Sequence, residues 1–178
     1  MIYFISDTHF CHKNIISRCN RPFENVTQMN DALISNWNRV VGKADEIYVL
    51  GDFSFRGTVE QTLEILGSLK GKKHLIVGNH DLYLNKQGFD RSAFLSVSHY
   101  LELNYKDARY ILFHYPIVEW AHYHRKSVHL YGHLHRQILP INEEWGKRAI
   151  SVAADVINFT PISAEEVYAK AFGDVSSA

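Results

Sequence analysis

The chain has 178 residues and a mass of 20.6 kDa, which fits a single domain of ordinary size over residues 1–178. With 46% hydrophobic and 13% aromatic residues against 21% charged residues, it can form a packed core, which excludes a disordered chain and a disulfide-stapled miniprotein. The 19 Lys and Arg residues balance the 19 Asp and Glu residues. No global positive charge would therefore draw the protein to nucleic acid, which we expect only as a possible substrate.

The start of the chain gives no sign of export or membrane insertion. Its apolar run, residues 1–5, ends at Ser6 and is too short for a signal sequence or a membrane span. Cys11 and Cys19 form no CxxC pair and suit a reducing compartment. We expect a cytoplasmic protein that does not associate with membranes.

Short apolar runs rich in Ile, Val, Tyr and Phe recur at the length of buried strands. They cover residues 2–5, 47–50, 75–77, 110–113, 128–131 and 149–153. Helical patterns separate the early runs, which implies right-handed crossovers between parallel strands, whereas the second half, from Ser98 on, is mostly strand with short connections. We therefore predict a layered α/β sandwich with a mixed sheet region.

Three helices are predicted from periodicity and capping residues. The first covers residues 27–41, where large apolar side chains recur every fourth residue and Thr27 can act as the N-cap. The second begins at a capping box over residues 58–61, and the last begins at another over residues 163–166.

Polar clusters of Asp, Asn and His follow five of the apolar runs, at the strand ends where open α/β sheets bind their ligands. The residues in them that could bind a metal are Asp7, His9, Asp52, Asn79, His114, His133 and His135. Asp7 and His9 are two residues apart, and so are His133 and His135. We expect the two side chains of each pair to point to one side of an extended chain. Seven ligands exceed one tetrahedral site but would serve two ions if a carboxylate bridges them.

The ligand types also indicate the metal and the substrate. Carboxylate oxygens mixed with imidazole suit Mn, Fe, Zn, Co or Ni rather than Mg or Ca, and we favour Mn. Two divalent cations outweigh the charges of Asp7 and Asp52, so the centre would attract an anion such as a phosphate ester. A metal pair can also hold a bridging hydroxide at neutral pH for attack on phosphorus.

The motifs DxH, GD, GNHD, H and GHxH, in this order and spacing, resemble the calcineurin-like metallophosphoesterase superfamily, in the form of its small bacterial and phage members. The resemblance extends over roughly residues 1–163 and implies a four-layer α/β/β/α sandwich. It implies that one ion is held by Asp7, His9, Asp52 and His135. It implies that the other is held by Asp52, Asn79, His114 and His133, so that Asp52 bridges the two.

By the same resemblance, the GNHD motif supplies two catalytic residues. His80 would contact the phosphate and protonate the leaving oxygen, and Asp81 would orient its ring. The chain is thus expected to hydrolyse phosphodiesters or phosphomonoesters by attack of a metal-bridged hydroxide on phosphorus. Small molecules or nucleotides are expected as substrates rather than proteins.

One departure from the family and three features outside the motifs bear on specificity. Phe55 stands where the family's GDxxDRG variant has its second Asp, which argues against a protein serine/threonine phosphatase. His12, Arg56 and the aromatic and basic segment 115–125 are each either substrate contacts or surface and packing residues.

Two other kinds of protein fit parts of the pattern. A catalytically silent scaffold of the same fold would bind a protein partner, and loss of ligands or of His80 would signal it. A structural zinc site would bind one ion in a closed set of four ligands, often with Cys. Neither the ligands nor His80 are lost in this sequence.

Overall fold

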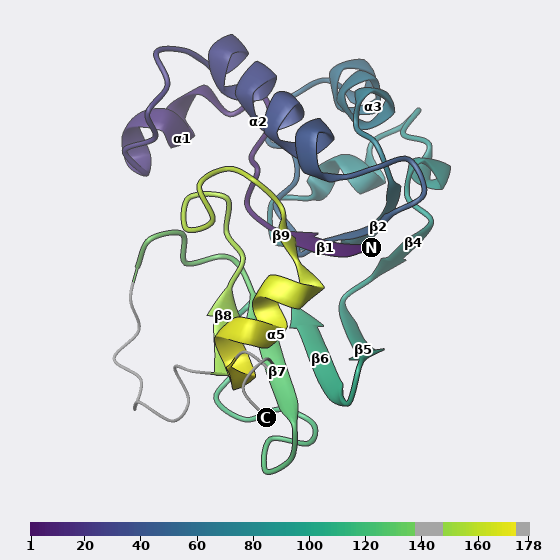
Figure 1. Ribbon diagram of the computed structural model, residues 1–178. Helices are drawn as coiled ribbons and strands as arrows, with labels where there is room; N and C mark the ends of the chain where they lie inside the picture. Colours follow the sequence, from purple (N-terminus) through teal and green to yellow (C-terminus); the bar gives the residue numbers. More distant parts are fainter. Residues whose placement is uncertain (138–147, 174–178) are drawn as a thin grey trace.

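Two β-sheets with helices packed on them make up the part of the chain that the computed structural model describes, residues 1–137 and 148–173 (Figure 1). In chain order the elements are β1 (Ile2–Ile5), α1 (Lys13–Arg18), α2 (Val26–Val40), β2 (Glu46–Val49), α3 (Val59–Ser68), β3 (Lys72–Ile76), the 3-10 helices η1 (Leu82–Asn85) and η2 (Arg91–Ala93), β4 (Ser96–Ser98), β5 (Tyr100–Tyr105), β6 (Ala108–Phe113), β7 (Ser127–Tyr131), β8 (Ala149–Ser151), β9 (Ile162–Ser163) and α5 (Ala164–Phe172). Within these ranges, none of the helices has the length and apolar character that crossing a bilayer requires.

The first sheet has the strand order β4-β3-β2-β1-β9. Strands β1 to β4 are parallel, and β9 joins β1 in the antiparallel direction. The crossovers between β1, β2 and β3 contain α2 and α3, which confirms the parallel arrangement predicted for the first half of the chain. The second sheet, β5-β6-β7-β8, is mixed as predicted, because β5 and β6 form an antiparallel hairpin while β6, β7 and β8 are parallel.

The two sheets pack face to face, and their inner faces share one hydrophobic core. The ring of Phe4 on β1 stacks on the ring of Tyr110 on β6, with 5.7 Å between their centroids. Leu112 and Val128 of the second sheet are fully buried in the same core. Helix α5 adds Val167, so this helix covers part of the core between the sheets (Figure 1).

Helices α2 and α3 cover the other face of the first sheet. Met29, Leu33 and Trp37, spaced four residues apart on α2, are at most 1% exposed and pack in the same cluster as Ile47 of β2. Burying a side chain of this size contributes about 1.5–3 kcal/mol. This periodic stripe therefore fixes α2 to the sheet whose strand ends carry the candidate ligands.

The expected sandwich is confirmed in its two packed sheets and in its helical layer. Among the described residues, the irregular segment 115–125 packs on the outer face of the second sheet. Trp120 of this segment is only 6% exposed and packs against Ile111 and Tyr131 on the outer face.

The capping boxes before α3 and α5 are confirmed. The N-cap predicted for the first long helix is wrong: α2 begins at Val26, and Asn25 rather than Thr27 is its N-cap. The Asn25 side chain accepts a hydrogen bond of 2.9 Å from the backbone N–H of Gln28. Asn is at least as good a cap as Thr, and its position two residues earlier satisfies the first turn.

Candidate metal centre

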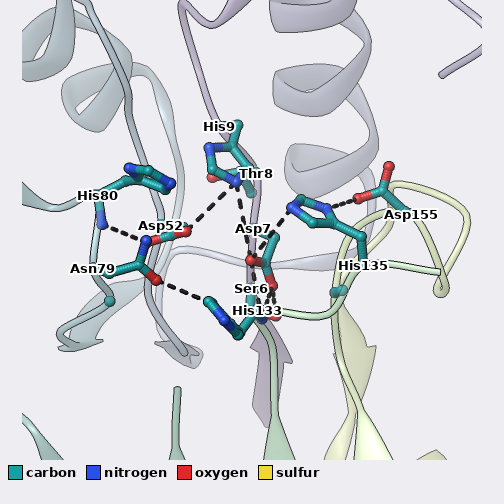
Figure 2. Close-up of polar contacts among 12 residues, drawn as sticks. Ser6, Asp7, Thr8, His9, Asp52, Asn79, His80, His133, His135 and Asp155 are labelled. Carbon is teal, nitrogen blue, oxygen red and sulfur yellow. Dashed lines mark hydrogen bonds and ion pairs between the residues drawn. The ribbon is translucent and has the colours of Figure 1, made fainter. Parts of the chain in front are cut away.

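All seven candidate ligands lie in segments that follow five strands, β1, β2, β3, β6 and β7. Figure 2 shows six of these side chains directed toward one another, together with His80 and Asp155. The sheets thus bring together residues that are more than 120 positions apart in the chain, as the strand-end pattern predicted.

The first group of ligands surrounds the buried imidazole of His9. Its Nε2 atom lies 4.0 Å from Oδ1 of Asp7 and 3.6 Å from Oδ2 of Asp52. Nε2 of His135 lies 4.0 Å from the same Asp7 oxygen. One ligand atom from each of Asp7, His9 and His135 falls within 4.8 Å of the others, a spacing that one metal ion can bridge.

The second group gathers around the side-chain oxygen of Asn79. Oδ1 of Asn79 lies 3.0 Å from Nε2 of His114 and 3.0 Å from Nδ1 of His133. The same His114 nitrogen lies 3.6 Å from Oδ1 of Asp52. The two carboxylate oxygens of Asp52 thus face different groups of ligands, an arrangement that suits a bridging role.

The buried nitrogen atoms of the first group fit a cation. His9 is 1% exposed, and neither of its ring nitrogens has a hydrogen-bond partner in the described part of the chain. A buried polar atom without a partner is costly, and such atoms are rare in folded proteins. A cation between His9, Asp7 and Asp52 would be the missing partner of the His9 Nε2 atom.

The tautomer of His114 leads to the same conclusion for the second group. Its Nδ1 lies 2.7 Å from the backbone carbonyl oxygen of Leu50, so in the neutral ring this nitrogen carries the proton and donates it. Nε2 then presents a lone pair to the oxygens of Asn79 and Asp52, which are acceptors as well. Acceptors converge in this way around a metal ion.

The backbone at the site is held in an uncommon conformation. Asp7, His9, Asp52, His133 and His135 have φ angles of 53°, 50°, 55°, 69° and 52°, in the left-handed region. Our expectation that the paired ligands lie in extended chain is therefore wrong, because left-handed turns after the strands direct their side chains inward. Such backbone strain is concentrated at functional sites.

Two glycines let ligand carboxylates lie directly against the backbone. A Cβ atom at Gly132 would overlap the Asp7 carboxylate, and one at Gly78 would overlap Oδ1 of Asp52. The backbone N–H of His133, the residue after Gly132, donates to both Asp7 oxygens at 3.0 and 3.1 Å. The glycines of the GN and GH motifs are thus part of the ligand geometry.

An ion pair that the motifs did not reveal supports the first group. Asp155 accepts hydrogen bonds of 2.9 Å from both Nε and Nη2 of Arg21, and its Oδ2 lies 2.7 Å from Nδ1 of His135. Arg21 also donates to the backbone carbonyl oxygens of Asp7 and Thr8, at 2.7 and 2.9 Å. Asp155 therefore fixes the His135 ring, and Arg21 fixes the loop that carries two ligands.

Burial and neighbouring charges shift the pKa values of this set. Burial raises the pKa of Asp7 to about 6, against the opposing effect of His135, and burial also lowers the pKa of His9 well below its usual range. Burial acts to lower the pKa of His135, but hydrogen bonds with Asp155 and Cys19 raise it to about 10. A cation favours ionised carboxylate and neutral imidazole, the states in which these groups bind metals.

Comparison with known proteins agrees with this geometry. Residues 1–137 match the calcineurin-like phosphoesterase family. The chain belongs to this family. An uncharacterized protein of Methanocaldococcus jannaschii, MJ1445, is 36% identical over 91% of this chain and 86% of its own length. The gene 66 protein of Mycobacterium phage L5 is 37% identical, over 44% of this chain and 39% of its own length.

A solved structure extends the similarity to the whole fold. The protein of unknown function AQ665 from Aquifex aeolicus is 26% identical and superposes with a TM-score of 0.70, covering 94% of this chain and 97% of its own. Membership of the calcineurin-like phosphoesterase family supports metal-dependent phosphoester hydrolysis as the general class of reaction.

Asp81, the last residue of the GNHD motif, is bound by backbone groups of two loops. Both carboxylate oxygens of Asp81 accept hydrogen bonds from backbone N–H groups, those of Asp52 at 2.9 Å, Phe53 at 2.8 Å and Gly78 at 2.7 Å. This carboxylate holds the loops after β2 and β3 together. Asp81 therefore positions the backbone beside Asp52, and its role in orienting the His80 ring stays a prediction.

His80 lies on the wall of a cleft beside the ligands. Its backbone N–H donates to Oδ1 of Asp52 at 2.8 Å, and its ring meets the ring of Phe55 edge-on, with 4.5 Å between centroids. The cleft has a volume of about 510 Å³, and His80 lines it together with the ligands His9, His133 and His135. A substrate in this cleft would contact both His80 and the ligand set.

The sequence left His12, Arg56 and the segment 115–125 open as substrate contacts, and only some of them lie at this cleft. His12 lines it. Arg56 does not, and its guanidinium lies 5.4 Å from the Phe55 ring centroid. In the segment 115–125, only Tyr115 approaches a ligand, with its ring centroid 4.7 Å from that of His133, while Trp120 packs on the second sheet. Most of this segment therefore fits the interpretation of surface and packing residues.

Proposed function

We propose that the protein hydrolyses phosphoesters at a centre of two divalent metal ions. One ion would be held by Asp7, His9, Asp52 and His135. The other would be held by Asp52, Asn79, His114 and His133. The observation that carries the proposal is the buried His9 ring, whose unpartnered Nε2 atom faces the carboxylates of Asp7 and Asp52.

The two ions, when bound, would supply Lewis acidity toward the phosphoryl oxygens and lower the pKa of water. The chain's own contribution is a rigid site. Asp81 and Arg21 bind the loops that carry the carboxylates, and Asp155 holds the His135 ring. Rigid ligands place the reacting groups without reorganisation during the reaction, which is the main source of electrostatic catalysis.

His80 is the proposed proton donor to the leaving oxygen. Its side chain lines the cleft, and its backbone is tied to the bridging Asp52 at 2.8 Å, so its distance from the reacting phosphorus is set by the same carboxylate. Histidine is suited to this step because its unperturbed pKa lies near neutrality. Phe55 restricts the ring from one side.

The substrate that this site favours is a small phosphoester. The cleft of about 510 Å³ is in the range of small-molecule sites. We further propose manganese as the preferred metal, because oxygen and imidazole ligands are mixed without thiolate in the proposed ligand sets. A cytoplasmic location remains part of the proposal, with no membrane or protein partner required for activity.

The test is hydrolysis of a chromogenic phosphodiester and of the matching monoester by metal-stripped protein, before and after addition of Mn, Zn, Fe, Co, Ni or Mg. Turnover restored by metal supports the hydrolase and identifies the ester class. Circular dichroism of the same samples shows whether the stripped protein is folded. A folded, metal-loaded protein that cleaves neither ester with any metal would favour a silent scaffold instead.

A further inference from the structure

The cleft beside the candidate metal centre carries positive charge beyond its ligands. Its lining includes Arg18, at the end of α1, and Arg136, which follows the ligand His135. Apart from Asp52, no carboxylate of the described residues lines it. Since the whole chain has no net charge, this is a local excess, which attracts anions to the cleft.

Arg18 is exposed, and its guanidinium has no hydrogen bond or ion pair within residues 1–137 and 148–173. Arg21, three residues later, differs, because its guanidinium is buried and bound by Asp155 and two backbone carbonyl groups. The two arginines of this short segment thus have separate roles. Arg21 supports the ligands, and the side chain of Arg18 remains available to a molecule in the cleft.

His12 lies on the cleft wall at the start of the same helix. It is 7% exposed, and although it occupies the N-cap position of α1, its side chain makes no capping hydrogen bond. Its Nδ1 is buried and has no partner among the described residues. A buried imidazole without a protein partner is a group that a ligand can satisfy.

Phe55 packs against both His12 and the proposed proton donor, His80. Its ring centroid lies 4.5 Å from that of His12 and 4.5 Å from that of His80. The ring of His12 also lies 5.3 Å from that of His9. Phe55 therefore contacts two residues of the cleft wall, His12 and His80.

We propose that His12 and Arg18 form a subsite for a second anionic group of the substrate. The preferred substrates are then organic diphosphates, or phosphoesters with a second phosphate, rather than monoesters of uncharged alcohols. The proposal rests on the proposed function, because the first phosphate is assigned to the metal centre. Arginine suits this role since its fork of N–H groups binds two phosphate oxygens together.

The test compares binding of AMP and of α,β-methylene-ADP, a diphosphate analogue whose P–CH2–P linkage resists hydrolysis, by isothermal titration calorimetry at a fixed excess of free Mn²⁺. The wild-type protein should bind the analogue about tenfold more tightly than AMP. Arg18→Ala should remove most of this preference and leave the affinity for AMP and for Mn²⁺ unchanged. His12→Ala should reduce the preference in the same direction.

Lys13→Ala is the matched control, because Lys13 is an exposed cation on the same helix that does not line the cleft. It should leave the preference intact. Equal affinities of the wild-type protein for both nucleotides, or an equal loss in the Arg18 and Lys13 variants, would overturn the subsite.

The hydrolase function and the subsite can be refuted independently of each other. A protein that prefers the diphosphate analogue but cleaves no ester with any metal retains the subsite and loses the hydrolase function. A protein that cleaves simple esters and binds both nucleotides equally loses only the subsite.

Discussion

Oδ2 of Asp155 lies 2.7 Å from Nδ1 of His135, while the other ring nitrogen of His135 faces Asp7 (Figure 2). The carboxylate fixes both the tautomer and the orientation of a candidate metal ligand. It is in turn held by two hydrogen bonds of 2.9 Å from Arg21, and both side chains are fully buried.

Asp155→Asn should therefore weaken metal binding by about 10–100-fold, because the His135 ring loses its charged partner. It should also destabilise the fold by about 3–5 kcal/mol, because Arg21 is left buried without its counter-ion. Calorimetric Mn²⁺ titration and chemical denaturation measure the two effects.

The exposed pair of Asp107 and Lys126 provides a matched control for this substitution. The side chains are 65% and 39% exposed, so Asp107→Asn should cost far less stability than Asp155→Asn and leave metal binding unchanged. Similar losses in both variants would show that Asp155 has no special role at the centre.

Asp52→Asn should abolish turnover and weaken the binding of both ions, because the two oxygens of Asp52 face different ligand groups. His80→Ala should leave Mn²⁺ affinity unchanged and lower the rate by about 10²–10⁴-fold, the usual contribution of a proton donor. Steady-state kinetics and metal titration on both variants separate these roles. Full activity of Asp52→Asn would refute the bridge.

Gly132→Ala should lose metal binding, because its Cβ would overlap the carboxylate of Asp7 and the side chain of Ser6. Gly67 in α3 is the control, since a Cβ there meets nothing within 4 Å. Gly67→Ala should raise stability by about 0.5–1 kcal/mol, since alanine favours a helix more than glycine does. Thermal unfolding and metal titration of both variants check this pair. Normal metal affinity in Gly132→Ala would contradict the role of the GH glycine.

His129 predicts a pH dependence of stability that is separate from the metal centre. It is fully buried, and burial lowers its pKa from 6.5 to about 4. Below pH 6.5 the unfolded chain takes up a proton that the folded chain does not, so stability falls as the pH drops from 6.5 toward 4. Between pH 7.5 and pH 5 the titration of His129 should lower the free energy of unfolding by about 2 kcal/mol.

The measurement is the free energy of unfolding of the metal-free protein at these two pH values, for the wild type and for His129→Gln. The variant should show a pH dependence smaller by this amount. An identical pH dependence in the two proteins would mean that His129 is not held neutral in the fold.

Much of the ligand set could be predicted because each ligand follows a strand, and strand ends of neighbouring parallel strands meet at one edge. Asp7 and Asp52 illustrate this, as β1 and β2 pair in parallel register just before them. Their left-handed backbone could not be predicted, because non-glycine residues adopt it only when the surrounding structure imposes it.

Arg21 and Asp155 could not be predicted for a different reason. They are 134 positions apart, and neither belongs to a motif with characteristic spacing. Their pairing arises only when the segment after β8 returns to the loop after β1, where Ala153 and Ser6 form a parallel bridge. The backbone partners of Asp81 also depend on this packing of loops from different strands.

The most direct test of the central claim is the number of Mn²⁺ ions bound per chain at which ester hydrolysis appears, measured by titrating metal-stripped protein. The two ligand groups around Asp52 predict two ions per chain, with full turnover only after the second has bound. Full turnover with one ion bound, or with none, would contradict a dinuclear centre.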